Sequence, residues 1–399
     1  MPCVRGADGA AGDGLKLHAW ADYAVAPVPS FRRLGVNALF LEPQMGGLDT
    51  YARELIPQLL TLAPELEVAL YVNAAGRAHI AREPWASEVR LVSHPLLGVR
   101  GTRALAELSA VGLLARDDDV LHSLAMTGPL VTRAQHVVTL ADTTWIDDTS
   151  KHGAPTYRMW RAVIPRVARR ADRVIAISEA GKRDIVNRLG VPTERIDVTL
   201  LGHADTGTQE PAPAVRRRHG LPAGPLVLSV GTRKEHKNLG RLVEAMGSVP
   251  DAALVLAGNP TDLDGQLRAA AQRGGVDLHL LGFLDSADVE ALYREASAFV
   301  LPSLNEGFGL PLLEAMRRGI PTATSNVSSL PEVAGDAALL FDPHDTDAIA
   351  AAIRCLLHDD AVRARLAREG PVRAGRFTWR ATAQATLASY ERAWNATPT

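Results

Sequence analysis

The feature that most constrains the fold is an alternation of short apolar runs with amphipathic segments along most of the chain. Short apolar runs bounded by turn residues are typical of buried parallel strands, and the segments between them are typical of helices. A repeated strand–helix order predicts a doubly wound parallel sheet, which is an α/β fold. The runs that we assign to strands are residues 36–41, 68–72, 89–92, 120–122, 136–140, 226–230, 253–257, 278–281 and 298–301.

A chain of 399 residues is too long for a single hydrophobic core, so we expect two domains, or three at most. The segment 206–224, TGTQEPAPAVRRRHGLPAG, is rich in Pro, Gly and Ala and breaks the strand–helix order, as interdomain linkers do. We therefore expect five parts along the chain. They are an N-terminal extension at 1–35, a first domain at 36–205, the linker at 206–224, a second domain at 225–375 and a C-terminal helix at 376–399.

Composition and charge exclude several classes of protein. The chain is 47% hydrophobic and 22% charged, which is typical of a soluble globular protein. Its formal net charge of −2 gives no general attraction to nucleic acid. Two cysteines, Cys3 and Cys355, are too few for a disulfide framework or a thiolate metal cluster, and they indicate a reducing compartment. Because no apolar run is long enough for a signal peptide or a membrane span, we expect a cytoplasmic protein.

The strand expected at 298–301 leads into a loop and a helix that could bind an anion. The loop, residues 302–309, contains Gly307 and Gly309, and the helix begins at Leu310-Pro311, since proline suits the first helical turn. A helix start carries N–H groups without partners and the positive end of the helix dipole, which together favour a phosphate. Glycines before it let a ligand approach the backbone closely.

Two glutamates accompany this predicted phosphate pocket. Glu306 lies in the loop and Glu314 about one turn into the helix. Carboxylates only accept hydrogen bonds, so two of them beside a phosphate suit a hydroxyl-rich ligand such as a ribose and a sugar. Taken alone, such a pair is more often two solvated side chains at an ordinary strand–loop–helix corner.

The segment around these glutamates resembles a known family. Residues 305–343, NEGFGLPLLEAMRRGIPTATSNVSSLPEVAGDAALLFDP, are similar to the Glu-x7-Glu signature of the retaining glycosyltransferases of family 4. The resemblance, extended over residues 36–395, implies the GT-B fold: two Rossmann-like domains that face a cleft, the first binding the acceptor and the second the nucleotide sugar. It implies that the donor contacts Glu306, Gly307, Phe308, Gly309, Leu310 and Glu314.

A second segment supports the same resemblance. Gly231-Thr232-Arg233 follows a predicted strand, and Lys237 stands near the start of the next helix. A basic turn of this kind is usually only solvated. It resembles the family's VGT…KN segment, however, in which the lysine contacts the donor diphosphate. The resemblance therefore implies a catalytic role for Lys237 beside Glu306, and donor contacts for Gly231, Thr232 and Arg233. Many members carry Arg directly after the glycine, where this chain has Thr232.

In the first domain, the resemblance points to two further places. Gly46-Gly47 follows a predicted strand, and in the family a Gly-Gly loop here faces the donor and the acceptor. Asp142 matches the second residue of a His-Asp pair, whereas Ala141 replaces the histidine that usually helps to hold the donor sugar. Ser178-Glu179 matches a further pair, for which helix capping is the simpler explanation.

One segment of the first domain is strongly basic. Residues 151–195 contain eleven Lys or Arg and four Asp or Glu. Such a surface could meet an anionic, lipid-linked acceptor or the inner leaflet of a membrane. The alternative is a pair of solvated helices.

The resemblance implies an enzyme, a retaining glycosyltransferase of hexosyl type that moves a sugar from a nucleoside diphosphate sugar to a hydroxyl acceptor. The product would be a polysaccharide, a glycolipid or a natural product. The VGT…KN form favours GDP-mannose or a related donor. No metal or other cofactor is expected, because Lys237 and the helix start would stabilise the leaving diphosphate. The alternatives are a non-catalytic nucleotide-sugar-binding protein and a phosphorylase or epimerase of the same fold. A dehydrogenase fits worst, because the chain lacks GxGxxG.

Overall fold

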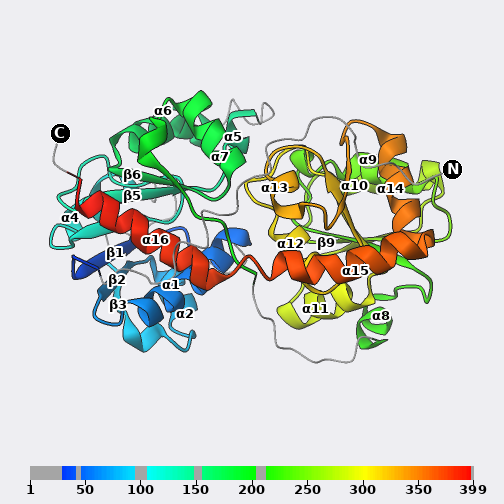
Figure 1. The fold of residues 1–399 in the computed structure, drawn as a ribbon, viewed down its shortest axis with the longest axis horizontal. Coiled ribbons are helices and arrows are strands. Elements are labelled where there is room, and N and C mark those ends of the chain that lie inside the picture. The colour runs from blue at the N-terminus through cyan, green and yellow to red at the C-terminus, as the bar shows by residue number, and fades with distance from the viewer. Residues whose placement is uncertain (1–28, 42–45, 95–105, 148–154, 204–212, 397–399) are drawn as a thin grey trace. The chain divides into compact units, whose positions relative to one another are not determined.

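The computed structural model describes residues 29–41, 46–94, 106–147, 155–203 and 213–396. The chain forms two compact units (Figure 1). The C-terminal unit consists of residues 203–377. The N-terminal unit comprises the described residues before 203 together with residues 378–396. Of the N-terminal extension expected at residues 1–35, residues 1–28 lie outside the described residues.

The N-terminal unit is built on a seven-stranded sheet in which every pairing is parallel. The strand order is β3-β2-β1-β4-β5-β6-β7, so the direction of winding reverses between β1 and β4. The strands are β1 Arg33–Asn37, β2 Glu67–Tyr71, β3 Arg90–Val92, β4 Val120–Ser123, β5 Gln135–Leu140, β6 Arg173–Ala176 and β7 Ile196–Val198.

Helices cover both faces of this sheet (Figure 1). They are α1 Gly47–Leu62, α2 Ala74–Ile80, α4 Val111–Leu114, α5 Thr144–Asp147, α6 Pro155–Arg170, α7 Glu179–Asp184 and α16 Trp379–Trp394. Shorter turns are η2 Ala86–Glu88, η4 Ala106–Ala110, η6 Ile185–Leu189 and η7 Thr193–Arg195. The last helix, α16, packs on α1, and the buried Thr382 hydroxyl donates to Leu200 O at 2.7 Å. The end of the chain therefore belongs to the N-terminal unit.

The C-terminal unit is built on a six-stranded parallel sheet with the order β10-β9-β8-β11-β12-β13. Its winding reverses between β8 and β11, as in a Rossmann fold. The strands are β8 Leu226–Val230, β9 Ala253–Ala257, β10 Leu278–Leu281, β11 Ala298–Leu301, β12 Thr322–Ser325 and β13 Leu339–Phe341. The central strand β8 pairs Val227 with Leu254 of β9 on one side and with Ala298 of β11 on the other.

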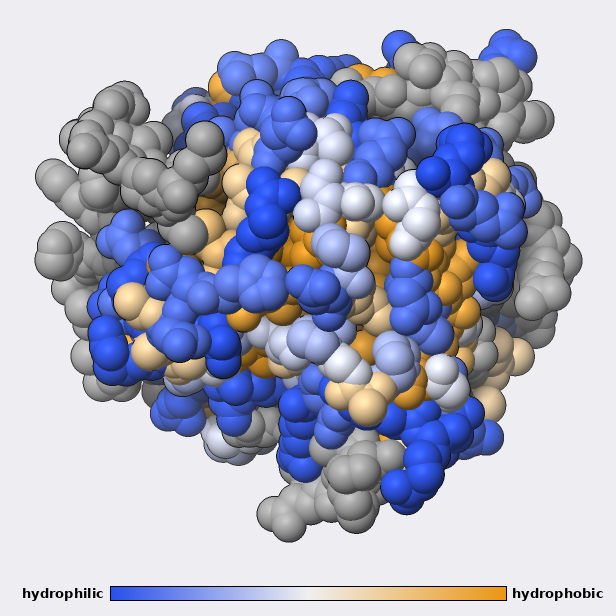
Figure 2. Space-filling view, turned by 90° about the vertical axis from the view of Figure 1, so that its right-hand side faces the viewer, coloured by the Kyte–Doolittle hydropathy of each residue, from blue (hydrophilic) through white to orange (hydrophobic). Residues whose placement is uncertain are grey.

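The helices of this unit are α8 Pro213–His219, α9 Leu239–Met246, α10 Asp264–Gly274, α11 Ser286–Glu295, α12 Leu310–Arg317, α13 Leu330–Ala334, α14 Thr346–His358 and α15 Asp360–Ala374, with the short turn η8 Glu235–Lys237. Apolar faces of α9, α10 and α14 meet the sheet in one core. In the view of Figure 2, hydrophilic residues predominate at the surface, and apolar residues show between them toward the middle.

The α/β class with two Rossmann-like parallel-sheet domains is as predicted from the sequence. Strands β8 to β11 have the predicted bounds. The first strand differs, because it begins at Arg33 and ends at Asn37, whereas residues 36–41 were expected. Residues 38–41 are fully buried but form a turn. An apolar run reports burial, and only hydrogen bonding decides whether that buried segment is a strand.

Two further observations concern membranes and cysteines. In the part of the chain that the structure describes, no helix is both long and apolar enough to cross a bilayer. Cys355 of α14 is buried, while Cys3 lies outside the described residues. The expectation of a reducing compartment stays a prediction.

Candidate functional site

The candidate site lies where two neighbouring strands of the C-terminal unit end. Strands β8 and β11 are hydrogen-bonded neighbours, and Phe299 pairs with Leu228. The turn that follows β8 carries Gly231 and Lys237, and the loop that follows β11 carries Glu306. Because winding reverses between these strands, their connections leave on opposite faces of the sheet. This is where open α/β sheets bind ligands.

The turn after β8 has an enforced backbone path. Gly231 has φ 145°, which favours glycine, and its N–H donates to Ala257 O at 2.8 Å. At the far end of the turn, Asn238 has φ 56°, and its side-chain amide donates to Pro302 O at 3.1 Å and to Pro343 O at 2.7 Å. The turn is therefore fastened to the loop after β11.

Lys237 and Glu306 meet across these two loops. The Lys237 ammonium lies 2.6 Å from Glu306 Oε1, and both side chains are largely buried, at 16% and 11% exposure. The Ser303 hydroxyl donates to the same oxygen at 2.6 Å. Burial alone would raise the pKa of Glu306, but the Lys237 charge and the two hydrogen bonds outweigh it and lower the pKa. Glu306 is therefore a carboxylate at neutral pH.

Two serines after β12 hold the backbone of the Glu306 loop. The N–H of Glu306 donates to Ser328 Oγ at 3.0 Å, and the Ser329 hydroxyl lies 2.9 Å from Glu306 O and 3.0 Å from Phe308 O. Ser328 has φ 55°, a backbone conformation that costs free energy for a residue other than glycine. Nothing in the spacing of Ser303, Ser328 and Ser329 marks them in the sequence, although the last two stand in the segment 305–343 that resembles the family.

Helix α12 begins beside Glu306 with its first turn uncapped by any side chain. Gly309 has φ 103°, and a Cβ there would lie 2.8 Å from the Leu330 side chain, so glycine is required on both counts. Pro311 stands in the first turn. The N–H groups of Leu312 and Leu313 both donate to Gly309 O, and Pro311 has none. The start of α12 therefore suits an anion mainly through the positive end of its dipole. Phe308, by contrast, is 3% exposed and packs edge-on against Phe377, so its ring belongs to the core.

Glu314 lies one turn into α12 and is held from α11. The Tyr293 hydroxyl donates to Glu314 Oε2 at 2.8 Å. Burial raises the pKa of Glu314, which the Tyr293 hydrogen bond and the Arg318 charge only partly offset. The two glutamates thus differ, because Glu306 has a cation directly on its carboxylate and Glu314 has a hydroxyl.

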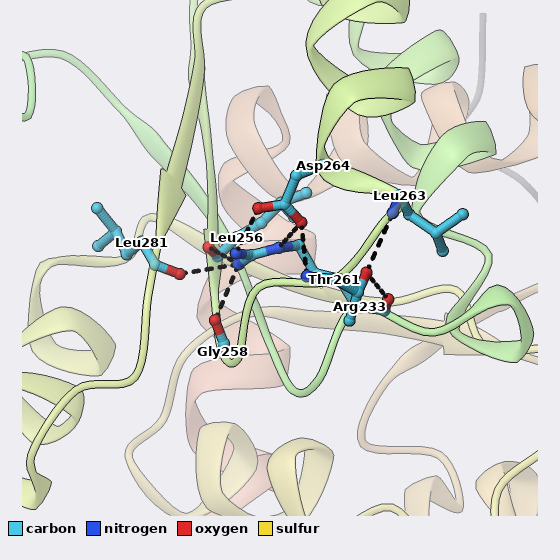
Figure 3. A network of polar contacts seen from close by, with 7 residues as sticks. All are labelled: Arg233, Leu256, Gly258, Thr261, Leu263, Asp264 and Leu281. Carbon is cyan, nitrogen blue, oxygen red and sulfur yellow. Dashed lines mark hydrogen bonds and ion pairs between the residues drawn. The ribbon is translucent and has the colours of Figure 1, made fainter.

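Arg233 has a structural role that the sequence analysis did not include. Its side chain is 2% exposed and forms a bidentate ion pair with Asp264 at 2.7 and 2.9 Å. The same guanidinium donates to Leu281 O at 2.8 Å and to Gly258 O at 3.0 Å (Figure 3). It thus ties together the ends of β9 and β10. The guanidinium is thus buried and largely engaged within the protein, while the expected donor contact of Arg233 stays a prediction. Thr232 beside it is partly exposed.

The remaining candidates belong to the N-terminal unit. Gly46 has φ 66° and precedes α1, whose first residue is Gly47. The Asp142 carboxylate, after β5, accepts from Thr144 N at 2.9 Å and from its hydroxyl at 2.6 Å, so it serves as a local cap. Residues 42–45 lie outside the described residues. Ser178 caps α7 by accepting from Gly181 N at 2.9 Å, which confirms the capping explanation.

Comparisons with known proteins bear on both units. The family described as "Glycosyltransferase Family 4" matches residues 45–202, and the family "Glycosyl transferases group 1" matches residues 213–373. Among curated proteins, O-antigen chain mannosyltransferase B of Escherichia coli is 35% identical over 231 residues, which are 55% of this chain and 61% of that protein. The chain therefore spans less than two thirds of this relative. An MMP alpha-(1->4)-mannosyltransferase of Mycolicibacterium hassiacum is 29% identical over 290 residues, with 69% and 68% covered.

Solved structures agree on the fold. Anabaena Alr3699/HepE, in complex with UDP and glucose, superposes with a TM-score of 0.72 at 18% sequence identity, over 90% of this chain and 98% of that one. At this identity, the likeness shows the fold alone. The two family matches together span both Rossmann-like units, including the loops after β8 and β11. The chain therefore belongs to the glycosyltransferases of family 4.

Proposed function

We propose that this protein transfers a sugar from a nucleoside diphosphate sugar to a hydroxyl acceptor, with retention at the anomeric carbon and without a metal. The observation that carries the proposal is the buried Lys237–Glu306 pair beside the uncapped start of α12, at the winding reversal of the C-terminal sheet. It brings together a cation, a carboxylate and the positive end of the α12 dipole, which suit a leaving diphosphate and a sugar hydroxyl.

In this proposal the diphosphate lies against Lys237 and the start of α12. Gly231 leaves room for it, since the Lys237 ammonium lies 3.8 Å from the place a Cβ would take on Gly231. As the sugar–phosphate bond breaks, negative charge develops on the diphosphate, and positioned positive charge stabilises it. Glu306 accepts hydrogen bonds from the donor sugar, and Glu314 from the ribose. The leaving phosphate oxygen takes the proton of the attacking acceptor hydroxyl, so no protein nucleophile is assigned.

The names of the relatives favour a mannosyl donor. Both curated relatives described above are named mannosyltransferases, while other similar proteins are named D-inositol 3-phosphate glycosyltransferases. Together with the VGT…KN segment, this favours GDP-mannose or a related sugar. A thermal-shift screen of GDP, UDP, dTDP and ADP tests the base, because a ligand that binds only the folded state raises its melting temperature.

An anionic acceptor or leaflet is supported by α6. This helix has no acidic residue, and its arginines at 158, 161, 166, 169 and 170 are exposed, while Ile164 and Val167 are buried. One face is thus cationic and the other apolar. We propose that this face meets a lipid-linked acceptor or the inner leaflet, with the protein otherwise in the cytoplasm.

Product analysis tests the reaction itself. Incubation of the full chain with the stabilising nucleotide's sugar, with and without candidate acceptors, should release nucleoside diphosphate and give a glycoside whose anomeric configuration equals that of the donor. An inverted product would contradict retention. Binding without any release above a buffer control would instead favour the non-catalytic nucleotide-sugar-binding protein.

A further inference from the structure

Tyr293 is a fully buried tyrosine that contacts the nucleotide half of the proposed site. It lies on α11 with 0% exposure, and its hydroxyl lies 2.8 Å from Glu314 Oε2 and 3.3 Å from Pro311 O. The shorter distance goes to the carboxylate, so the single hydroxyl proton is donated there. Glu314 itself is only partly buried. One end of this contact is therefore in the core and the other is open to a ligand.

Arg318 and Glu290 fix the tyrosine in turn. The Arg318 guanidinium lies over the Tyr293 ring, 4.6 Å from its centre, and donates to Glu314 O at 2.6 Å. Its Nε donates to Glu290 Oε2 at 2.9 Å, and Glu290 is 6% exposed. A planar guanidinium held by a carboxylate is well suited to stack on an aromatic ring. The hydroxyl of Tyr293 thus has a fixed position relative to the first turn of α12.

We propose that Tyr293 is a positioning residue that holds the Glu314 carboxylate in the orientation that receives the ribose hydroxyls of the nucleotide. The inference rests on the proposed function, in which Glu314 binds the ribose. A glutamate has three side-chain torsions, whose freedom is lost when a ligand binds. The Tyr293 hydroxyl removes that freedom beforehand. It engages Oε2 and leaves Oε1 for the ligand.

The same contact affects the charge of Glu314. Burial raises the pKa of its carboxyl, Glu290 raises it further, and the Tyr293 hydroxyl and Arg318 lower it. An ionised carboxylate accepts hydrogen bonds from both ribose hydroxyls, whereas a protonated one must place a hydrogen on one oxygen. Loss of the Tyr293 hydroxyl should therefore shift the acid decline of nucleotide affinity to higher pH.

The test is Tyr293→Phe, which removes one oxygen and keeps the ring beneath Arg318. Calorimetry of the full chain would compare the nucleoside diphosphate that stabilises it best with the 2′-deoxy and 3′-deoxy forms of the same diphosphate. We expect about fivefold to tenfold weaker binding of the ribonucleotide, within the range of one ordinary hydrogen bond, because Tyr293 acts on the ligand only through Glu314. At least one deoxy form lacks the hydroxyl that would donate a hydrogen bond to Glu314. That form should bind the unmodified protein and Tyr293→Phe equally. A loss of equal size for all three nucleotides would mean a merely structural tyrosine and would overturn the proposal.

Tyr71→Phe is the matched control. Tyr71 of the N-terminal unit also donates to a carboxylate, Asp118 Oδ2 at 2.5 Å, and lies 3.3 Å from a backbone oxygen, that of Leu114. This variant should lower stability without changing nucleotide affinity. Should Tyr293→Phe unfold, Arg318→Lys removes the stacked guanidinium and should give a smaller loss that is again confined to the ribonucleotide.

Glu314→Gln separates the proposal from the function on which it rests. If this variant binds the ribonucleotide as the unmodified protein does, Glu314 does not bind the ribose, and both the ribose assignment and the role of Tyr293 fall. If Glu314→Gln weakens binding and Tyr293→Phe does not, the function stands and the positioning role of Tyr293 alone is overturned.

Discussion

In both units the strand order reverses at the centre of a parallel sheet, between β1 and β4 in one and between β8 and β11 in the other. In the C-terminal unit, the loops beyond this point bring together the charged pair Lys237–Glu306. In the N-terminal unit, β4 and β5 instead carry His122 and His136, which are both buried. Their hydrogen-bond partners are neutral hydroxyls. The Tyr390 hydroxyl lies 2.7 Å from His122, and Ser123 Oγ lies 3.0 Å from His136.

This difference shows that a common strand order does not decide whether the centre of the sheet holds charged or neutral groups. Burial disfavours a charge unless an opposite charge compensates it. Glu306 has such a partner, so its pKa is lowered despite burial. Neither histidine has an opposite charge among the groups that shift its pKa. Burial and the nearby His136 lower the pKa of His122 to about 3. Burial lowers the pKa of His136 to about 4. One sheet centre therefore holds a charged site, and the other holds neutral structural groups.

The largest expected effect of this contrast is acid sensitivity of the N-terminal unit. Unfolded histidines titrate near pH 6.5, while the folded ones stay neutral to about pH 4 or below. The unfolded state thus binds more protons in this range. The stabilisation is complete above pH 6.5 and is lost as pH falls, by up to about 1.4 kcal/mol per pH unit for each histidine.

Tryptophan fluorescence can follow this unit alone, because all six tryptophans lie outside residues 203–377. Urea titrations between pH 7 and 4.5 should show the fluorescence transition moving to lower urea as pH falls. The double variant His122→Gln, His136→Gln should be less stable at pH 7 but lose less stability on acidification. If that variant lost stability on acidification just as steeply, the buried histidines would not be the cause of the acid sensitivity.

The second effect concerns the charged centre. Lys237→Met should lower turnover by about 100-fold or more, the size found when one group stabilising developing negative charge is removed. Lys234→Met is the matched control, because this lysine is exposed in the same turn and outside the Lys237–Glu306 contact. Steady-state kinetics of the two variants should differ widely. Similar rates for both would show that the buried pair has no catalytic role.

A smaller effect is expected for the surface of α6. Reversal of Arg166, Arg169 and Arg170 to Glu should weaken binding to anionic vesicles, since each basic residue near such a surface contributes about 1 kcal/mol. Nucleotide affinity should be unchanged, because the site that we propose lies in the C-terminal unit. Flotation with phosphatidylserine vesicles checks this. If the unmodified protein does not float with the vesicles, α6 is only a solvated helix.

The two centres also differ in how far the sequence reveals them. Strands β8 to β11 follow from apolar runs bounded by turn residues, which is local information. Lys237 and Glu306 were singled out by resemblance, and the structure brings them into contact. The structural role of Arg233 could not be predicted, because its partner Asp264 stands 31 residues further along the chain and no pattern connects the two.

Ser328 and Tyr293 were missed for a related reason. A positive φ at a serine, or a buried hydroxyl aimed at a carboxylate, arises only when segments distant in the sequence are packed together. Local patterns thus predict where strands end, and hence where a site lies. They do not predict which side chains hold that site in shape.

The central claim is that the C-terminal unit binds a nucleoside diphosphate sugar through two glutamates with separate roles. Calorimetry with the bare nucleoside diphosphate, in the presence of EDTA, tests it most directly. Glu314→Gln should weaken binding about tenfold or more, as expected for a lost hydrogen bond to a charged group. Glu306→Gln should leave this binding nearly unchanged and lower turnover with the whole donor. Equal losses of diphosphate affinity in both variants, or binding by the unmodified protein that needs a divalent metal, would contradict the account.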